Sequence, residues 1–233
     1  MRKPENNISI HESFSVGALL ALAGGFLDAY TYLSRGGVFA NAQTGNMVLL
    51  GIRLAERNWG GAVRYLIPII AFAAGVLLAE WIQSALKGRA NVRWRQAVLL
   101  LEIALLAIIG FVPDGRWNWA VNVAVSFVCA LQGEAFRTMH GLSYATTMCT
   151  GNLRSGTECL FLYFQTRNRL LLSNGMKYYA IIVVFIVGAV LGVFLTGWLA
   201  ERAVWVPASL LAVVFSVLFQ RSPEQPVPPQ SRQ

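Results

Sequence analysis

Two stretches of this sequence place an acidic side chain inside an apolar segment, where it could take up and release a proton. Asp28 lies in the first stretch, Gly24 to Glu56, and Glu134 holds the matching position in the second, Cys129 to Phe161, at an offset of 134 − 28 = 106 residues. A carboxylate inside a membrane span costs a few kcal/mol and usually faces a partner or a cavity. We therefore predict that both acids couple protons to another process. The alternative is structural, with each acid paired to Arg35, to Arg137 or to a tyrosine hydroxyl.

A Thr-Gly-Asn motif follows each acid and repeats at the same offset, since 150 − 44 is also 106. We predict that Thr44 and Thr150 are the N-caps of two short helices that begin near the middle of the membrane. The first N–H groups of a helix have no partner within the helix, so two such helix starts that face one cavity would suit an anion or a carboxylate. The predicted substrate-binding residues are Asn41, Gln43, Thr44, Gly45, Asn46, Thr146, Thr147, Thr150, Gly151 and Asn152. The alternative is that these polar groups only cap the short helices and join the two halves.

The composition indicates a membrane protein. Of the 233 residues, 56% are hydrophobic and only 13% are charged, and the mean hydropathy is +0.54. The hydrophobic share is above that of a typical soluble domain and the charged share is below it. The net charge of +8 comes from basic residues between apolar segments. It therefore indicates membrane topology and contact with anionic lipid rather than nucleic-acid binding.

Six apolar stretches approach the roughly 20 residues needed to cross a bilayer. They lie at about 14–34, 64–86, 95–113, 117–138, 177–199 and 203–220. Two shorter pieces, about 46–57 and 151–165, are long enough for half a membrane only. We predict an all-α integral membrane fold with six transmembrane helices and two half-helices.

The distribution of basic residues predicts an orientation. With six spans and both termini in the cytoplasm, 6 of the 19 basic residues lie outside and 13 inside, as the positive-inside rule requires. The sequence from Arg64 also resembles that from Lys177, at an offset of 113. The expected divisions are a polar N-terminal tail (1–13), a first repeat (14–113), a second repeat (114–220) and a disordered tail (221–233). Three spans per repeat make the two repeats inverted relative to each other.

Several other features carry less weight. Glu102 lies in the middle of a span and is expected to form a hydrogen bond with a neighbouring helix. Gly188 and Gly192 form a GxxxG pattern, which predicts close packing inside the bundle or, alternatively, a homodimer. No motif of a hydrolase, nucleotide-binding enzyme or metalloenzyme is present in the sequence. We therefore expect no enzymatic activity, no cofactor and no metal.

A set of first-half residues resembles the YoaK-type family of bacterial multi-pass membrane proteins, a family of unknown function. The matching segments are Gly25-Phe26-Leu27-Asp28-Ala29, Val38-Phe39-Ala40-Asn41 and Gln43-Thr44-Gly45-Asn46. The second half departs from this pattern, with Glu134 as its acid and Ala145-Thr146-Thr147 in place of Phe39-Ala40-Asn41. The resemblance implies a bacterial inner-membrane location and the six-span layout, and it implies no activity.

The leading functional hypothesis is a small secondary transporter or permease. Its substrate, an anionic or carboxylate-bearing small solute, would bind between the two Thr-Gly-Asn helices, with protons coupled through Asp28 and Glu134. Two alternatives stay open: a passive channel through the same cavity, and a membrane scaffold or assembly protein in which the polar centre is only structural.

Overall fold

The computed structural model describes residues 13–85, 91–139, 142–143 and 149–220, and these form a helical protein. The first half contains α1 (Phe14–Ser34), α2 (Gln43–Ala55), α3 (Trp59–Ala85) and α4 (Asn91–Ile109). The second half contains α5 (Asn118–Ala135), α6 (Cys149–Thr166), α7 (Arg169–Leu199), the 3-10 helix η2 (Ala200–Val204) and α8 (Trp205–Gln220). A short antiparallel pair, β1 (Thr138–Met139) and β2 (Leu142–Ser143), follows α5. The all-α prediction is confirmed apart from this pair.

The two short helices each form a hairpin with the long helix that follows. In both turns an arginine with positive φ (Arg57, 55°; Arg167, 56°) precedes an asparagine. Asn58 Oδ1 accepts a hydrogen bond from the Gly61 N–H at 2.8 Å, and Asn168 Oδ1 accepts one from the Leu170 N–H at 3.0 Å. Because the asparagine caps the next helix, α3 and α7 begin at 59 and 169 rather than at the predicted 64 and 177. These Arg-Asn pairs are a sequence signal that the span-by-span prediction overlooked.

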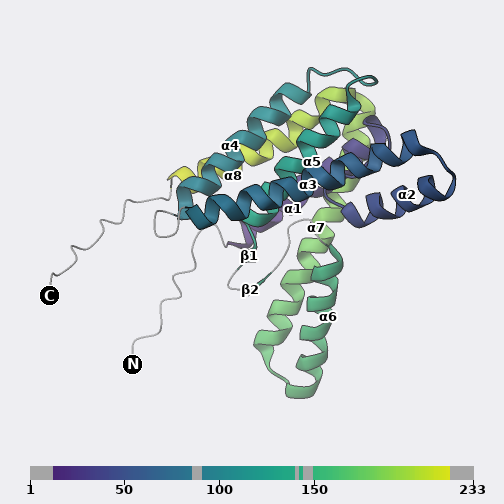
Figure 1. Cartoon of the computed structure of the whole chain (residues 1–233). Helices are drawn as coiled ribbons and strands as arrows, with labels where there is room; N and C mark the ends of the chain where they lie inside the picture. Colours follow the sequence, from purple (N-terminus) through teal and green to yellow (C-terminus); the bar gives the residue numbers. More distant parts are fainter. Residues whose placement is uncertain (1–12, 86–90, 140–141, 144–148, 221–233) are drawn as a thin grey trace.

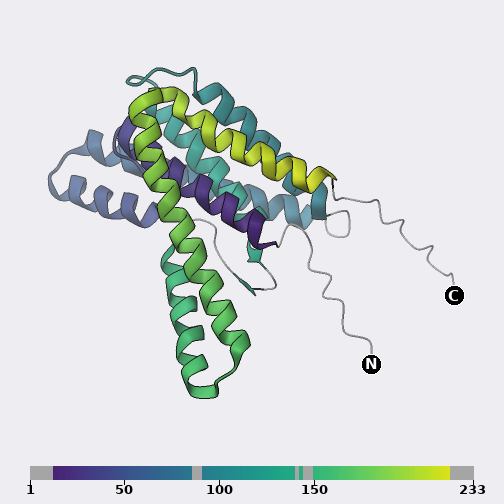
Figure 2. The same ribbon diagram turned by 180° about the vertical axis from the view of Figure 1, so that it is seen from behind.

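The ends of the hairpins that carry α2 and α6 extend away from the bundle, whereas the rest of α3 and of α7 packs within it (Figure 1). In Figure 1 the α2–α3 hairpin points to one side and the α6–α7 hairpin points downward, and Figure 2 shows the same arrangement from behind. Among the described elements, α2 packs mainly on α3 and α6 mainly on α7.

The remaining contacts pair helices of one half with helices of the other. Helix α1 packs against α7, α5 packs against α3, and α4 packs against α8. The α1–α7 contact depends on glycine, because a Cβ at Gly25 would overlap the backbone of Phe185 and one at Gly188 would overlap that of Leu22. Gly192 likewise lies against Phe26 and Ala29. The GxxxG pattern therefore serves packing inside the bundle, as its first interpretation predicts.

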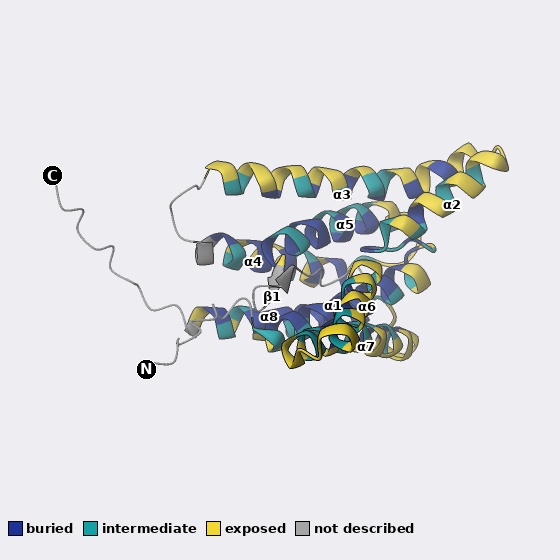
Figure 3. Ribbon diagram, turned by 90° about the horizontal axis from the view of Figure 1, so that it is seen from below, coloured by how far each residue is buried: buried dark blue, intermediate teal, exposed yellow. Residues whose placement is uncertain are grey.

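Helix α1 is the most buried of the apolar helices, whereas α3 and α7 expose much of their surface (Figure 3). Three stretches in the described part of the chain are long and apolar enough to cross a membrane: Phe14–Ser34, Trp59–Ala85 and Arg169–Phe219, the last covering α7, η2 and most of α8. Helices α4 and α5 fall outside this set, and α5 carries asparagine and glutamine side chains along its length. The structure thus fits an α-helical membrane protein.

Candidate functional site: a buried polar seam between α1 and α5

Asp28 lies at the centre of the described structure, where it is only 5% exposed. Its Oδ1 accepts a hydrogen bond from the backbone N–H of Asn41 at 2.7 Å. The side chain of Asn41 is also buried and donates through Nδ2 to the carbonyl oxygen of Gly24 at 3.3 Å. The alternative in which Asp28 pairs with Arg35 is wrong, because the guanidinium of Arg35 has other partners. Among the described residues, the carboxyl group is therefore held by a loop and not by a basic side chain.

The loop between α1 and α2 brings Asn41 back to Asp28. Gly36 and Gly37 adopt positive φ values of 86° and 75°, a conformation that glycine tolerates at little cost, and they reverse the chain after α1. The buried Asn46 then fixes the loop, since its Oδ1 accepts from the Phe39 N–H at 3.0 Å and its Nδ2 donates to the Phe39 carbonyl at 2.8 Å. Asn46 Nδ2 also donates to Gln43 Oε1 at 2.9 Å. Asn46 and Gln43 thus hold the loop that positions Asn41.

The predicted N-cap of the first short helix is wrong. Helix α2 begins at Gln43, its N-cap is Ala42, and no side chain caps it. Thr44 therefore lies inside the first turn, where its side chain is exposed. The carbonyl oxygen of Asn41 accepts a hydrogen bond from the Gln43 N–H at 2.8 Å, so backbone atoms close the turn before α2.

The second short helix also begins one residue earlier than the predicted cap. Cys149 is the first residue of α6, Thr150 and Gly151 are exposed in its first turn, and Asn152 is buried like its counterpart Asn46. The predicted residues Thr146 and Thr147 lie outside the described residues.

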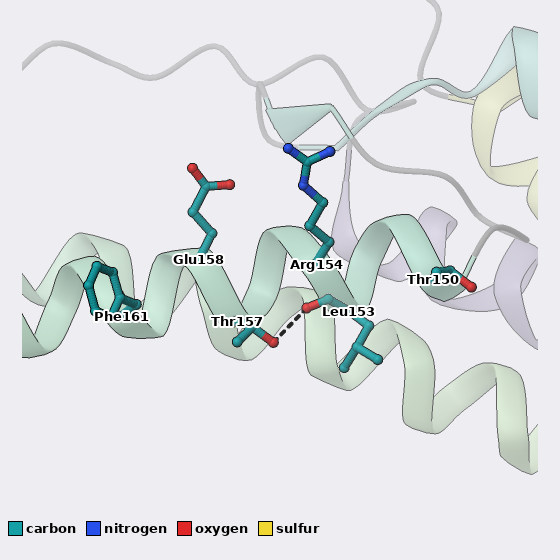
Figure 4. A pocket seen from close by; sticks show the side chains of 6 residues that line it. All are labelled: Thr150, Leu153, Arg154, Thr157, Glu158 and Phe161. Carbon is teal, nitrogen blue, oxygen red and sulfur yellow. Dashed lines mark hydrogen bonds between the residues drawn. The ribbon is translucent and has the colours of Figure 1, made fainter.

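A shallow open depression runs along one face of α6 and includes Thr150 (Figure 4). Its lining residues all belong to this helix: Thr150, Leu153, Arg154, Thr157, Glu158 and Phe161. Thr157 Oγ1 donates to the carbonyl oxygen of Leu153 at 2.8 Å, so this hydroxyl is occupied by its own helix. No residue of α2 lines the depression, and it therefore does not join the two Thr-Gly-Asn motifs.

Glu134 has a different environment from Asp28, although the two occupy the same repeat position. Its carboxylate forms an ion pair with Arg137 at 2.9 Å, and Arg137 also pairs with Glu80 of α3 at 2.8 Å. The Arg137 side chain is 58% exposed. For Glu134 the structural alternative with Arg137 is thus the one observed.

Helix α5 presents a buried polar face toward α1 and α4. Asn122, Ser126, Cys129 and Gln132 follow one another at spacings of three or four residues and are all buried, with the half-buried Asn118 at the start of this face. Helix α5 contacts α4, which carries Glu102, and α1, which carries Asp28. We call the polar residues of this α5 face, together with Asp28, Arg35 and Asn41, the polar seam.

Glu102 of α4 borders the inner part of the seam. It is fully buried, and Gln132 Nε2 donates to its two carboxyl oxygens at 3.1 and 3.3 Å. The predicted hydrogen bond to a neighbouring helix is confirmed. Glu102 and Asp28 are thus two buried acids on helices that both contact α5.

Arg35 closes the other end of the seam and is fully buried. Its Nη2 donates to Tyr30 Oη at 2.6 Å and to the Val112 carbonyl at 2.8 Å, and its Nη1 donates to Asn118 Oδ1 at 3.3 Å. Carbonyl groups at the end of a helix carry partial negative charge, so the end of α4 offsets the charge of the guanidinium. The backbone oxygen of Arg35 accepts from Asn122 Nδ2 at 2.8 Å, which ties this residue to α5 as well.

Arg35 and the polar residues of α5 belong to the site, although their residue types and spacing were not used to predict it. The helical spacing of Asn118, Asn122, Ser126 and Cys129 is a signal that could have identified the polar face of α5. The partners of Arg35, by contrast, lie up to 83 residues away along the chain. Within the part of the chain that the structure describes, no group of three or more metal-ligating side chains occurs.

The comparisons with known proteins agree with this architecture. The model of the family "Protein of unknown function (DUF1275)" matches residues 16–217. UPF0700 transmembrane protein YoaK of Bacillus subtilis (strain 168) is 28% identical over 203 residues, which cover 83% of this chain and 88% of that protein. No solved structure matches. The chain therefore belongs to the DUF1275 family of membrane proteins, as its resemblance to the YoaK type predicted.

Proposed function

We propose that this protein is a small secondary transporter of the bacterial inner membrane, with six spans in two inverted halves and both termini in the cytoplasm. The observation that carries the proposal is the placement of Asp28. This acid is buried in α1 and is held by the backbone of the loop that leads into the first short helix.

The helix contacts made by one half correspond to those made by the other half, which supports the inverted repeat. The α1–α7 contact corresponds to α5–α3, α2–α3 corresponds to α6–α7, and α4–α5 corresponds to α8–α1. Gly75 on α3 packs on the backbone of Phe127 as Gly188 on α7 packs on that of Leu22, and 188 − 75 equals the offset of 113 between the two long helices. Transporters with inverted repeats place their sites near the midplane between the two halves.

Two opposing effects act on Asp28 and suit it to proton exchange. The start of α2 presents backbone N–H groups and the positive end of a helix dipole, which favour the carboxylate. Burial away from water favours the neutral acid. A group that balances these effects changes its protonation state when a neighbouring ligand or water changes.

This balance gives a route to coupled transport of an anion. While Asp28 is ionised, it occupies backbone donor groups of the loop that precedes α2, including the N–H of Asn41. Protonation weakens its hold on these donors, and an anionic solute can then bind to them. The solute and the proton therefore bind together, which is proton–anion symport.

Reconstitution into proteoliposomes tests the proposal. Uptake of a panel of radiolabelled small carboxylates is measured with and without an inward pH gradient. Asp28→Asn, which resembles the protonated acid, should retain exchange of the solute across the membrane and lose accumulation driven by the pH gradient. Glu134→Gln is the matched control from the second half and should keep that accumulation, since Glu134 is engaged by Arg137.

The alternatives give different results in the same experiment. Accumulation that persists unchanged in Asp28→Asn would contradict the coupling role of this acid. Flux that does not saturate with solute concentration would indicate a channel, and absence of any flux across the panel would favour the scaffold hypothesis.

A further inference from the structure

Three buried oxygen atoms on the polar seam have no hydrogen-bond partner among the described residues: Asn41 Oδ1, Asn122 Oδ1 and Ser126 Oγ. Their side chains are 4%, 2% and 0% exposed. Buried polar atoms in folded proteins are nearly always hydrogen-bonded, to protein or to ordered water, because an unpaired one costs its full desolvation energy. Three such atoms, two on one face of α5 and one in the loop after α1, therefore require an explanation.

The three atoms lie along a single path. Asn122 is anchored to the backbone of Arg35 near one end of the seam. Ser126 follows one turn later on the same face of α5, with Cys129 after it, and this helix contacts α1, on which Asp28 lies. The path therefore leads from Arg35 to Asp28 through the space between α1 and α5.

The internal repeat shows that the fold does not require polar residues here. The positions on α1 that correspond to Asn122, Ser126 and Cys129, at the offset of 106, are Val16, Leu20 and Ala23. All three are buried and apolar, and they belong to the main hydrophobic cluster. The polar face of α5 is therefore specific to one half of the protein.

The unpaired atoms also indicate what fills the path. The two amide oxygens can only accept a hydrogen bond, and the serine hydroxyl can accept or donate. A small molecule that donates hydrogen bonds would satisfy all three atoms. Water is such a molecule, and it fits a narrow path with several acceptors. Water chains also conduct protons between acidic groups.

We propose that the seam between α1 and α5 is a hydrated pathway that delivers protons to Asp28, with Arg35 as its outer closure. The proton-delivery part rests on the proposed function, whereas the hydration of the seam does not. At the outer end, Asn118 Nδ2 donates to Asp114 at 2.6 Å at the protein surface. Arg35 lies between this surface and Asn122, and its contacts with Tyr30 and Val112 hold the entrance closed. The charged or acidic groups that border the path are Asp28, Arg35 and Glu102.

Cysteine accessibility to silver ions tests the hydration. Silver ion is close to water in size and reacts with thiolates. In a background with Cys129→Ala, Cys149→Ala and Cys159→Ala, Ser126→Cys is treated with silver ion in membranes, and the unreacted thiol is then labelled with a maleimide after denaturation. Leu20→Cys, the repeat counterpart, is the matched control, because Leu20 is also fully buried.

We expect Ser126→Cys to react at least tenfold faster than Leu20→Cys. Equal slow reaction of both thiols would overturn the proposal. If Ser126→Cys does not fold, the native Cys129 in a Cys149→Ala, Cys159→Ala background gives the same comparison, because Cys129 lies on the same face.

A second measurement separates hydration from proton delivery. Asn122→Leu should slow silver reaction at Cys129 at least fivefold and slow proton-driven uptake, while Arg35→Gln should speed the silver reaction. If silver reacts fast with Cys129 but no solute flux is found, the seam is hydrated and the proposed transport function is wrong. Unchanged silver reaction in Asn122→Leu would overturn the pathway even if transport is observed.

Discussion

The backbone N–H of Asn41 donates to the carboxyl group of Asp28 across 13 residues of intervening chain, at 2.7 Å. This contact fastens the loop between α1 and α2 to the central helix. It also makes the protonation state of Asp28 and the position of the loop dependent on each other, because a carboxylate accepts a stronger hydrogen bond than a neutral acid does.

Replacement of Asp28 tests this contact through stability. Asp28→Ala removes the acceptor and leaves the buried N–H of Asn41 unpaired, which should lower the free energy of unfolding by about 1–3 kcal/mol. Asp28→Asn keeps an oxygen that can accept this hydrogen bond, so its free energy of unfolding should fall by less. Denaturant unfolding in detergent micelles measures the difference, and equal losses in the two variants would mean that the contact contributes nothing.

Removal of the buried guanidinium should affect stability more strongly. Arg35→Met leaves Tyr30 Oη and the Val112 carbonyl without their donor, so we expect a loss of about 3 kcal/mol or more. Tyr30→Phe should cost about 1–2 kcal/mol by the same reasoning. A double-mutant cycle of the two should show a coupling of about 1–3 kcal/mol, and strict additivity would contradict a direct interaction.

The α1–α7 contact predicts a strong difference between two glycines of α7. Gly188→Ala forces a methyl group against the backbone of Leu22 and should cost about 1–3 kcal/mol through displacement of the helices. Gly197→Ala is the control on the same helix, because a Cβ there meets nothing within 4 Å. Alanine favours helix over glycine by about 1 kcal/mol, so this variant should be neutral or slightly more stable. Thermal unfolding midpoints of the two variants test this prediction, and equal midpoints would contradict it.

The ion pairs of Arg137 should contribute little to stability. Because this side chain is largely exposed, Glu80→Gln and Glu134→Gln should each change the free energy of unfolding by about 1 kcal/mol or less. Added salt should reduce the effect further. A loss several times larger, insensitive to salt, would show that Arg137 holds α3 and α5 together in a dry environment.

The stability of the turn at η2 should decrease in acid. Backbone hydrogen bonds, including one from the Asp114 N–H at 3.1 Å, hold the pKa of Glu201 below its usual range. A carboxyl group with a lowered pKa in the folded protein contributes stability above its unfolded pKa and loses it as pH falls through the folded value. Exchange of the Asp114 amide hydrogen, corrected for its intrinsic pH dependence, should therefore show less protection in acid. Glu201→Gln should abolish this change, and a change that persists in that variant must have another cause.

Local patterns in the sequence predicted much of the helical layout. The apolar stretches, the repeat at 106 residues and the two short helices depend on residue type and spacing, and the observed helices follow them to within several residues. The Arg137 partner of Glu134 was also visible, because it lies three residues away on the same helix.

The tertiary structure decided which of the repeated residues share a site. Asp28 and Glu134 occupy one repeat position, yet only Asp28 is enclosed, because its loop returns to it and the face of α5 opposite is polar. Arg35 became part of the site through atoms of α4 and α5 that are 74 to 83 residues distant. The sequence by itself thus determined the membrane class and the extent of the helices, since these depend on hydropathy and on neighbours along the chain. The polar seam depends on how helices from the two halves pack, and only the folded structure brings those residues together.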